Sequence, residues 1–145
     1  QLKLLVIGPD ETYTADELRK VAQTAGNRIH ILGPVFGEKK DDYYAAADGY
    51  ISLSFKENFS YSAAEAMSAE LPLILSPGNC LSPTVRKIGG GWLLQSDDLS
   101  EAANAIRDFA QTTVGNLQNI GKRAKEFADA EFSENRFAER LSHLD

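Results

Sequence analysis

Two glutamates, Glu57 and Glu65, are the residues whose type and spacing most clearly suggest chemistry in this sequence. They lie eight positions apart in the segment KENFSYSAAEAMSAELPLILS, which covers residues 56–76. Glu57 stands just before a run of small residues, and Glu65 stands inside that run. A carboxylate can accept two hydrogen bonds from a vicinal diol, such as the 2′,3′-diol of a ribose. The pair could therefore bracket a nucleotide diphosphate that carries a polar group.

The residues between the two glutamates predict a helix that begins near Phe59 or Ser60. The first free backbone amides of that helix would belong to Ser60, Tyr61 and Ser62. Such amides carry a partial positive charge, which suits a phosphate or a diphosphate. Glu65 would lie about one and a half turns into the helix and reach past the phosphates. Glu57 would face the group that lies beyond them.

The same pair also has an ordinary interpretation, because two glutamates at this spacing occur often by chance. Glu65 would then be a solvated helix residue, and Glu57 a surface loop residue. Two observations favour a site instead. Glu57 follows a predicted strand, at the end where open parallel sheets bind ligands. A carboxylate among small apolar residues also needs a partner, and Glu65 is flanked by Ala63, Ala64, Ala66, Met67 and Ala69.

Five short apolar segments predict the strands that must position these residues. They are residues 2–8, 28–33, 49–53, 71–76 and 91–95. Segments with helical periodicity lie between them, and this alternation predicts a parallel sheet with helices on both faces. Four loops follow predicted strands and should line one edge of the sheet. They are residues 8–13, 33–40, 54–60 and 76–82.

Helical periodicity is clearest in the last third of the chain. Asp98 with Glu101 predicts an N-terminal helix cap. The helix that follows should bury one apolar stripe, made of Leu99, Ala102, Ala103, Ile106 and Ala110. Residues 114–144 also read as helical, with a break near 131–133. The last helix would carry Phe137, Leu141 and Leu144 on one face.

Composition limits the class of protein. The chain has 145 residues, a typical size for one domain, and a formal net charge of −6. No basic stripe with interleaved aromatic residues is present, so nucleic acid is not an expected partner. The single cysteine, Cys80, and the two histidines, His30 and His143, cannot assemble a zinc site or a nucleophilic triad. No apolar run approaches the ~20 residues of a membrane span.

Several motifs in this order resemble glycosyltransferase family 4, the retaining sugar-nucleotide transferases of the GT-B fold. The segment ENFSYSAAEAMSAELPLILS resembles the family signature of a glutamate, a Phe–Gly loop, a second glutamate after seven intervening residues, and a closing EAM-small-x-G-x-P-V-I. Five other segments are similar to family motifs in the same order: LLVIGPDE, RIHILGPV, YYAAADGYISLS, GGGWLL and EFSENRFAERL. The resemblance covers essentially the whole chain.

The resemblance implies an α/β fold, a three-layer Rossmann-like domain with a parallel sheet. This is the C-terminal, donor-binding half of a GT-B glycosyltransferase, over residues 1–145 with C-terminal helices at 114–144. Gln1 is followed at once by a strand-like segment, so we expect the chain to be a fragment. The N-terminal acceptor domain, the first strand of this domain and the family's phosphate-binding Arg and Lys would lie outside it. We therefore expect the isolated chain not to turn over.

The resemblance also implies a role for each site residue. Glu57 would act on the transferred sugar as the catalytic residue, and Glu65 would bind the ribose diol. The donor sugar and the diphosphate would contact Asn58, Phe59, Ser60, Tyr61 and Ser62. The nucleobase would contact the loop formed by Pro34, Val35 and Phe36. The family is generally metal-independent and no cofactor is expected, so the helix dipole and basic side chains would neutralise the leaving diphosphate.

The partners implied by the resemblance are a nucleotide-diphosphate sugar as donor and a saccharide or lipid as acceptor, the latter bound through the missing N-terminal domain. A hexosyltransferase of this kind would work in the cytoplasm, with the full-length protein associated peripherally with the inner face of the membrane. Polysaccharide biosynthesis is the usual role of such enzymes.

The sequence departs from the family at three positions. Ser60 replaces a glycine in the Phe–Gly loop, and a serine would be unfavourable there if the position needed a positive φ or a close approach of the backbone to the sugar. Glu70 replaces the glycine before Leu71 and Pro72, so the helix could end differently. The family's PEIV reads SPTV at residues 82–85, which loses an acidic residue.

Two other interpretations remain open. A receiver-like or flavodoxin-like signalling domain is also a parallel α/β fold of this size. A receiver needs a phosphorylatable aspartate at the end of its third strand, and here that strand ends at Leu53 and Ser54. A non-catalytic scaffold derived from a transferase is the second alternative, favoured by Ser60 and by the lost acid near Pro83.

Overall fold

The fold is described by a computed structural model of the chain, which defines residues 2–9, 15–57 and 59–132. The chain divides into two compact units, residues 1–43 and residues 44–145, called unit 1 and unit 2 below. Asn58 and the last helix predicted from the sequence, with Phe137, Leu141 and Leu144, lie outside the described residues.

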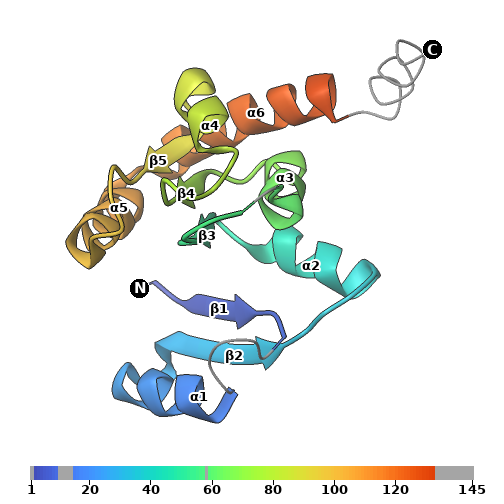
Figure 1. The fold of residues 1–145 in the computed structure, drawn as a ribbon. Helices are drawn as coiled ribbons and strands as arrows, with labels where there is room; N and C mark the ends of the chain where they lie inside the picture. Colours follow the sequence, from blue (N-terminus) through green and yellow to red (C-terminus); the bar gives the residue numbers. More distant parts are fainter. Residues whose placement is uncertain (1, 10–14, 58, 133–145) are drawn as a thin grey trace. The chain divides into compact units, whose positions relative to one another are not determined.

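Unit 1 is a β–α–β unit (Figure 1). Its elements are β1 (Leu4–Ile7), α1 (Ala15–Thr24), the 3₁₀ helix η1 (Gly26–Arg28), β2 (Ile29–Gly33) and the first residues of α2 (Glu38–Ala46). The two strands pair in parallel, with Leu4 opposite Ile29 and Val6 opposite Ile31. Helix α1 packs against β2. Both predicted strands of this region are confirmed.

Unit 2 contains a parallel three-stranded sheet in the order β3-β4-β5. Its strands are β3 (Tyr50–Ser52), β4 (Leu73–Leu75) and β5 (Gly91–Leu93). Its helices are the end of α2, α3 (Tyr61–Ser68), α4 (Ser82–Ile88), α5 (Leu99–Gln111) and α6 (Val114–Glu131). Each strand lies inside a segment that the sequence predicts as strand. No helix in the described part of the chain combines the length and the apolar character that crossing a membrane requires.

The central strand of unit 2 buries side chains on both faces, because successive residues of a strand point to opposite sides. Leu73 and Leu75 pack with residues of α3, α4 and α6. Ile74 packs with residues of α5. Figure 1 shows α5 apart from the other three helices, across the sheet. These three layers confirm the predicted α/β architecture with helices on both faces.

The predicted buried stripe of α5 is partly wrong. Leu99, Ala103 and Ala110 are exposed. The residues that pack against the sheet are Ala102, Ala105, Ile106 and Phe109. The reason is the ring of Phe109, which lies edge-on against Trp92 at a centroid distance of 5.7 Å and turns this face of the helix inward. The predicted cap is confirmed for Asp98, whose side chain accepts the Ser100 N–H. The carboxylate of Glu101 instead accepts the N–H groups of Gln95 and Ser96.

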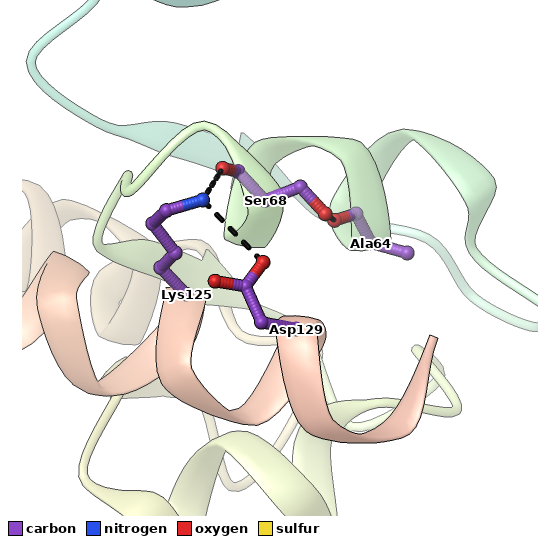
Figure 2. Close-up of polar contacts among 4 residues, drawn as sticks. All are labelled: Ala64, Ser68, Lys125 and Asp129. Carbon is purple, nitrogen blue, oxygen red and sulfur yellow. Dashed lines mark hydrogen bonds and ion pairs between the residues drawn. The ribbon is translucent and has the colours of Figure 1, made fainter. Parts of the chain in front are cut away.

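Helix α3 is held at its C-terminal end by α6. Figure 2 shows Lys125 of α6 donating to the backbone carbonyl of Ser68 at 3.1 Å, next to its own ion pair with Asp129 at 3.4 Å. The last carbonyls of a helix accept no hydrogen bond from the helix itself, and they carry partial negative charge. A lysine there satisfies one of them and ties the two helices together.

The turn after α3 is left-handed at Glu70, which has a φ of 64°. The Leu71 N–H donates to the Ala66 carbonyl and the Glu70 N–H to the Met67 carbonyl, which together form a Schellman motif. Glycine is the usual residue at the left-handed position of this motif. The helix therefore ends in the way that a glycine permits, although a glutamate occupies the position.

Candidate functional site

The candidate site lies in unit 2, around the start of α3. The helix begins at Tyr61 with Ser60 as its N-cap residue, one or two residues after the predicted start near Phe59 or Ser60. Ser60 has a φ of −87°, so this position does not need the positive φ that would favour glycine. Within residues 59–132, the N–H groups of Ser62 and Ala63 have no acceptor. The expectation that the backbone amide of Tyr61 is free was wrong, because this N–H donates to the Phe59 carbonyl at 3.2 Å.

Glu57 is held by the loop that follows β4. Its carboxylate Oε2 accepts a hydrogen bond from Asn79 Nδ2 at 2.9 Å, and its backbone N–H donates to the Gly78 carbonyl at 3.1 Å. The same Asn79 nitrogen lies 3.1 Å from Ser60 Oγ, and both Asn79 and Ser60 are buried. These bonds join Glu57 and Ser60, which follow β3, to Gly78 and Asn79, which follow β4. Such contacts are expected for loops at the carboxyl ends of neighbouring parallel strands.

Gly78 allows these two loops to approach each other. A Cβ at this position would overlap the backbone carbonyls of Ser54 and Phe55. Ser76 adds two further links, from its N–H to the Ser52 carbonyl at 3.1 Å and from its Oγ to the Ser54 carbonyl at 2.6 Å. Glycine is required here for backbone proximity.

Glu65 lies on α3 and is partly buried. Its Oε2 accepts a hydrogen bond from the Tyr44 hydroxyl at 3.1 Å. The same hydroxyl lies 3.1 Å from the Ser62 carbonyl. Four neighbours of Glu65 on this helix are buried: Ala63, Ala64, Ala66 and Met67. The expectation that a carboxylate among small apolar residues has a partner is confirmed.

A second tyrosine supports the start of α3 from β3. The Tyr50 hydroxyl and Ser62 Oγ lie 2.7 Å apart. Burial raises the pKa of the Tyr50 phenol above its ordinary 10.0 and outweighs the hydrogen bond with Ser62, which lowers the pKa. The negative charge of Glu57 raises the pKa further. The charge of Glu57 therefore acts on the tyrosine that supports the first turn of α3.

The other predicted site residues are only partly brought together. The Phe59 ring lies edge-on to Tyr61 at 4.7 Å and to Phe132 at 6.0 Å, between ring centroids. The predicted nucleobase loop belongs to unit 1, where Phe36 is 80% exposed. The structure thus joins Glu57, Ser60, Tyr61, Ser62 and Glu65 in one unit and describes Pro34, Val35 and Phe36 in the other.

Sequence reasoning missed three residues that support the site, namely Tyr44, Tyr50 and Asn79. Tyr44 and Tyr50 stand in the segment YYAAADGYISLS, which predicts a strand at residues 49–53 and resembles a family motif but marks neither tyrosine as part of a site. Asn79 stands in a loop that was expected to line the site, but nothing in its neighbourhood marks it as buried. In the part of the chain that the structure describes, no three His, Cys, Asp or Glu side chains are grouped to hold a metal ion.

A protein-family model described as "Glycosyl transferases group 1" matches residues 1–112 of this chain. The D-inositol 3-phosphate glycosyltransferase of Streptomyces scabiei is 31% identical over 112 residues, which are 74% of this chain and 25% of that protein. The GDP-mannose:cellobiosyl-diphosphopolyprenol alpha-mannosyltransferase of Komagataeibacter xylinus is 32% identical over 110 residues, which are 74% of this chain and 28% of that protein. The chain thus spans about a quarter of the length of these relatives.

Solved structures share the fold. The sucrose-phosphate synthase from Thermosynechococcus elongatus matches with a TM-score of 0.81 and 28% identity, over 98% of this chain and 37% of that chain. HepE of Anabaena, solved in complex with UDP-glucose, matches with a TM-score of 0.76 and 22% identity, over 99% and 41% of the chains. The C-terminal domain of a group 1 glycosyl transferase from Francisella tularensis matches with a TM-score of 0.75 and 17% identity, over 91% and 70%. These matches confirm the predicted fold class.

Proposed function

Because this chain belongs to the group 1 glycosyl transferases and has the fold of the C-terminal half of a GT-B enzyme, we propose that it is the donor-binding domain of a retaining sugar transferase. The whole protein would move a sugar from a nucleotide-diphosphate sugar to a saccharide or lipid acceptor. An N-terminal domain outside this chain would bind the acceptor. The family assignment replaces the interpretation as a receiver-like signalling domain.

The observation that carries this proposal is that two carboxylates are fixed on either side of the start of α3. Glu65 is held by the Tyr44 hydroxyl and Glu57 by the Asn79 amide. Both donors are neutral. A carboxylate offers about four acceptor positions, so each side chain can be held by the protein and still accept hydroxyl groups of a ligand.

The roles of the site residues follow from their places around α3. Glu65 would accept hydrogen bonds from the ribose diol, and Glu57 would face the transferred sugar. The diphosphate would lie at the first turn of the helix, where the amides of Ser62 and Ala63 have no acceptor within residues 59–132. Asn58, Phe59, Ser60 and Tyr61 would surround it. Contact of the nucleobase with Pro34, Val35 and Phe36 stays a prediction, as do the cytoplasmic location and the peripheral membrane association.

The scaffold alternative loses part of one of its two grounds. The replacement of glycine by Ser60 introduces no backbone strain, because Ser60 has a negative φ. The need for a close approach of the backbone to the sugar and the missing acid near Pro83 remain as grounds. Nucleotide binding therefore decides between a working donor domain and a scaffold.

The test is an amide NMR titration of this chain with UDP, GDP and ADP. UDP and GDP come first, because HepE was solved with UDP-glucose and the K. xylinus relative is named for GDP-mannose. We expect saturable shifts between Ser60 and Glu65 for one nucleotide, and their loss in Glu65→Ala. The matched control is Glu126→Ala, which removes an exposed glutamate of α6. Shifts of Val35 and Phe36 would support the nucleobase prediction.

The result that would contradict the proposal requires a measurement on the full-length protein as well. If neither this chain nor the full-length protein binds any of the three nucleotides, the scaffold alternative replaces the proposal. We also expect no glycosyl transfer from this chain alone. Detectable transfer by the isolated chain would show that the acceptor is bound here after all.

A further inference from the structure

Asn79 is the most completely engaged polar side chain of the site. It lies in the loop between β4 and α4 and is 1% exposed. Its Nδ2 donates to Glu57 Oε2 at 2.9 Å and to Ser60 Oγ at 3.1 Å, which uses both hydrogens of the amide group. Its Oδ1 accepts the Leu81 N–H at 3.0 Å. Both hydrogens of the side-chain amide therefore have an acceptor, and its oxygen has a donor.

The orientation of this amide is fixed from its own loop. The Asn79 N–H donates to the Ser76 carbonyl at 3.2 Å, and the Asn79 carbonyl accepts the Ser82 N–H at 3.0 Å. If the side-chain amide were reversed, Oδ1 would face the carboxylate of Glu57 and the Leu81 N–H would lose its acceptor. Burial makes both losses costly. Asn79 therefore presents a donor, and not an acceptor, to the Glu57 carboxylate.

Glu57 needs such a donor to keep one orientation. It belongs to a loop whose neighbours Phe55 and Lys56 are exposed, and its own side chain is only partly buried. A carboxylate in that setting would rotate in solvent if nothing held it. An arginine or a lysine would hold it with a positive charge and compete with the ligand for its oxygens. A buried neutral amide holds it without that competition.

We propose that Asn79 is the positioning residue for the sugar end of the site. It holds the Glu57 carboxylate and the Ser60 hydroxyl in the arrangement that receives the transferred sugar, without touching the sugar itself. This inference rests on the proposed function, in which Glu57 faces that sugar. Because Tyr44 and Glu65 hold the other end, Asn79 should govern the binding of the sugar group and not that of the nucleotide.

The experiment compares a nucleotide with its sugar conjugate. Dissociation constants are measured by NMR titration for UDP against UDP-glucose and for GDP against GDP-mannose, in the native chain and in Asn79→Ala and Asn79→Asp. We expect Kd for the nucleotide to stay within about twofold, and Kd for the nucleotide sugar to rise about tenfold or more. A merely structural role would weaken both ligands alike, and that result would overturn the inference.

A paired exchange guards against loss of folding in the single variants. Asn79→Asp combined with Glu57→Gln restores a donor and an acceptor between the two side chains, with their places reversed. We expect this double variant to regain thermal stability and not to regain the preference for the nucleotide sugar. Recovery of both would show that the sugar does not need the Glu57 carboxylate, and it would overturn the part of the inference in which that carboxylate receives the sugar. If neither the native chain nor the full-length protein binds a nucleotide or its sugar conjugate, the proposed function is overturned, and the inference with it.

Discussion

The Tyr44 hydroxyl lies 3.1 Å from Glu65 Oε2 and 3.1 Å from the Ser62 carbonyl. One phenol thus contacts both the carboxylate assigned to the ribose and the backbone of the first turn of α3. Hydrogen bonds to charged groups contribute about 1.5–3 kcal/mol. We expect Tyr44→Phe to weaken nucleotide binding about tenfold, measured by NMR titration.

The control for this prediction is the neighbouring tyrosine. Tyr43→Phe removes a hydroxyl from the adjacent residue and should leave the dissociation constant unchanged. Equal effects of the two substitutions would show that the Tyr44 hydroxyl does not act through Glu65.

Glu70 holds a left-handed conformation, with a φ of 64°, which costs a residue with a side chain about 1–2 kcal/mol. Glycine adopts this conformation without that cost. We expect Glu70→Gly to raise the free energy of unfolding by about 1 kcal/mol, measured by urea denaturation. Glu70→Ala keeps the strain and removes the carboxylate. If Glu70→Ala stabilises the chain as much as Glu70→Gly does, the gain comes from the lost charge and not from the backbone.

Helix α6 passes very close to the turn at Glu70. A Cβ at Gly121 would overlap the Glu70 carbonyl, whereas a Cβ at Gly115, in the same helix, would meet nothing within 4 Å. We expect Gly121→Ala to lower the free energy of unfolding by about 1–3 kcal/mol through overpacking. Gly115→Ala should raise it by about 0.5–1 kcal/mol, because alanine loses less backbone freedom on folding. Chemical denaturation of both variants checks this, and effects of the same sign would contradict it.

The buried Tyr50 predicts a loss of stability at alkaline pH. Burial raises the pKa of its phenol above 10.0, so the folded chain favours the neutral form more than the unfolded chain does. This contribution is fully present below pH 10 and is lost as the pH rises through the pKa of the folded state. We expect the free energy of unfolding of Tyr50→Phe to fall less steeply above pH 10 than that of the native chain. Tyrosinate absorbance in the native chain minus that in the variant should titrate above pH 10, and titration below that value would contradict the prediction.

The sequence by itself determined the strands and helices of the fold and the two carboxylates of the site, but not the residues that hold those carboxylates. The five apolar runs predict the five strands of the described residues, and the cause is clearest in β4, because burial on both faces of a parallel sheet leaves a continuous apolar signal. The small residues around Glu65 predict a packed helix with a carboxylate that needs a partner. The buried face of α5 was predicted one strip away from its true position. Periodicity alone does not tell which of two neighbouring helix faces is buried, and here the buried face is the one that carries Phe109.

Only the tertiary structure decided the partners. Asn79 meets Glu57 across 22 positions, because neighbouring parallel strands bring their carboxyl-end loops together whatever their separation in the chain. Tyr44 of α2 meets Glu65 of α3 across 21 positions. No local pattern encodes that proximity. The left-handed conformation of Glu70 is likewise set by the tertiary structure, because no local pattern predicts it for a glutamate. It occurs in the turn that passes close to Gly121 of α6. Local propensity is read along the chain, whereas these contacts depend on how separate segments pack.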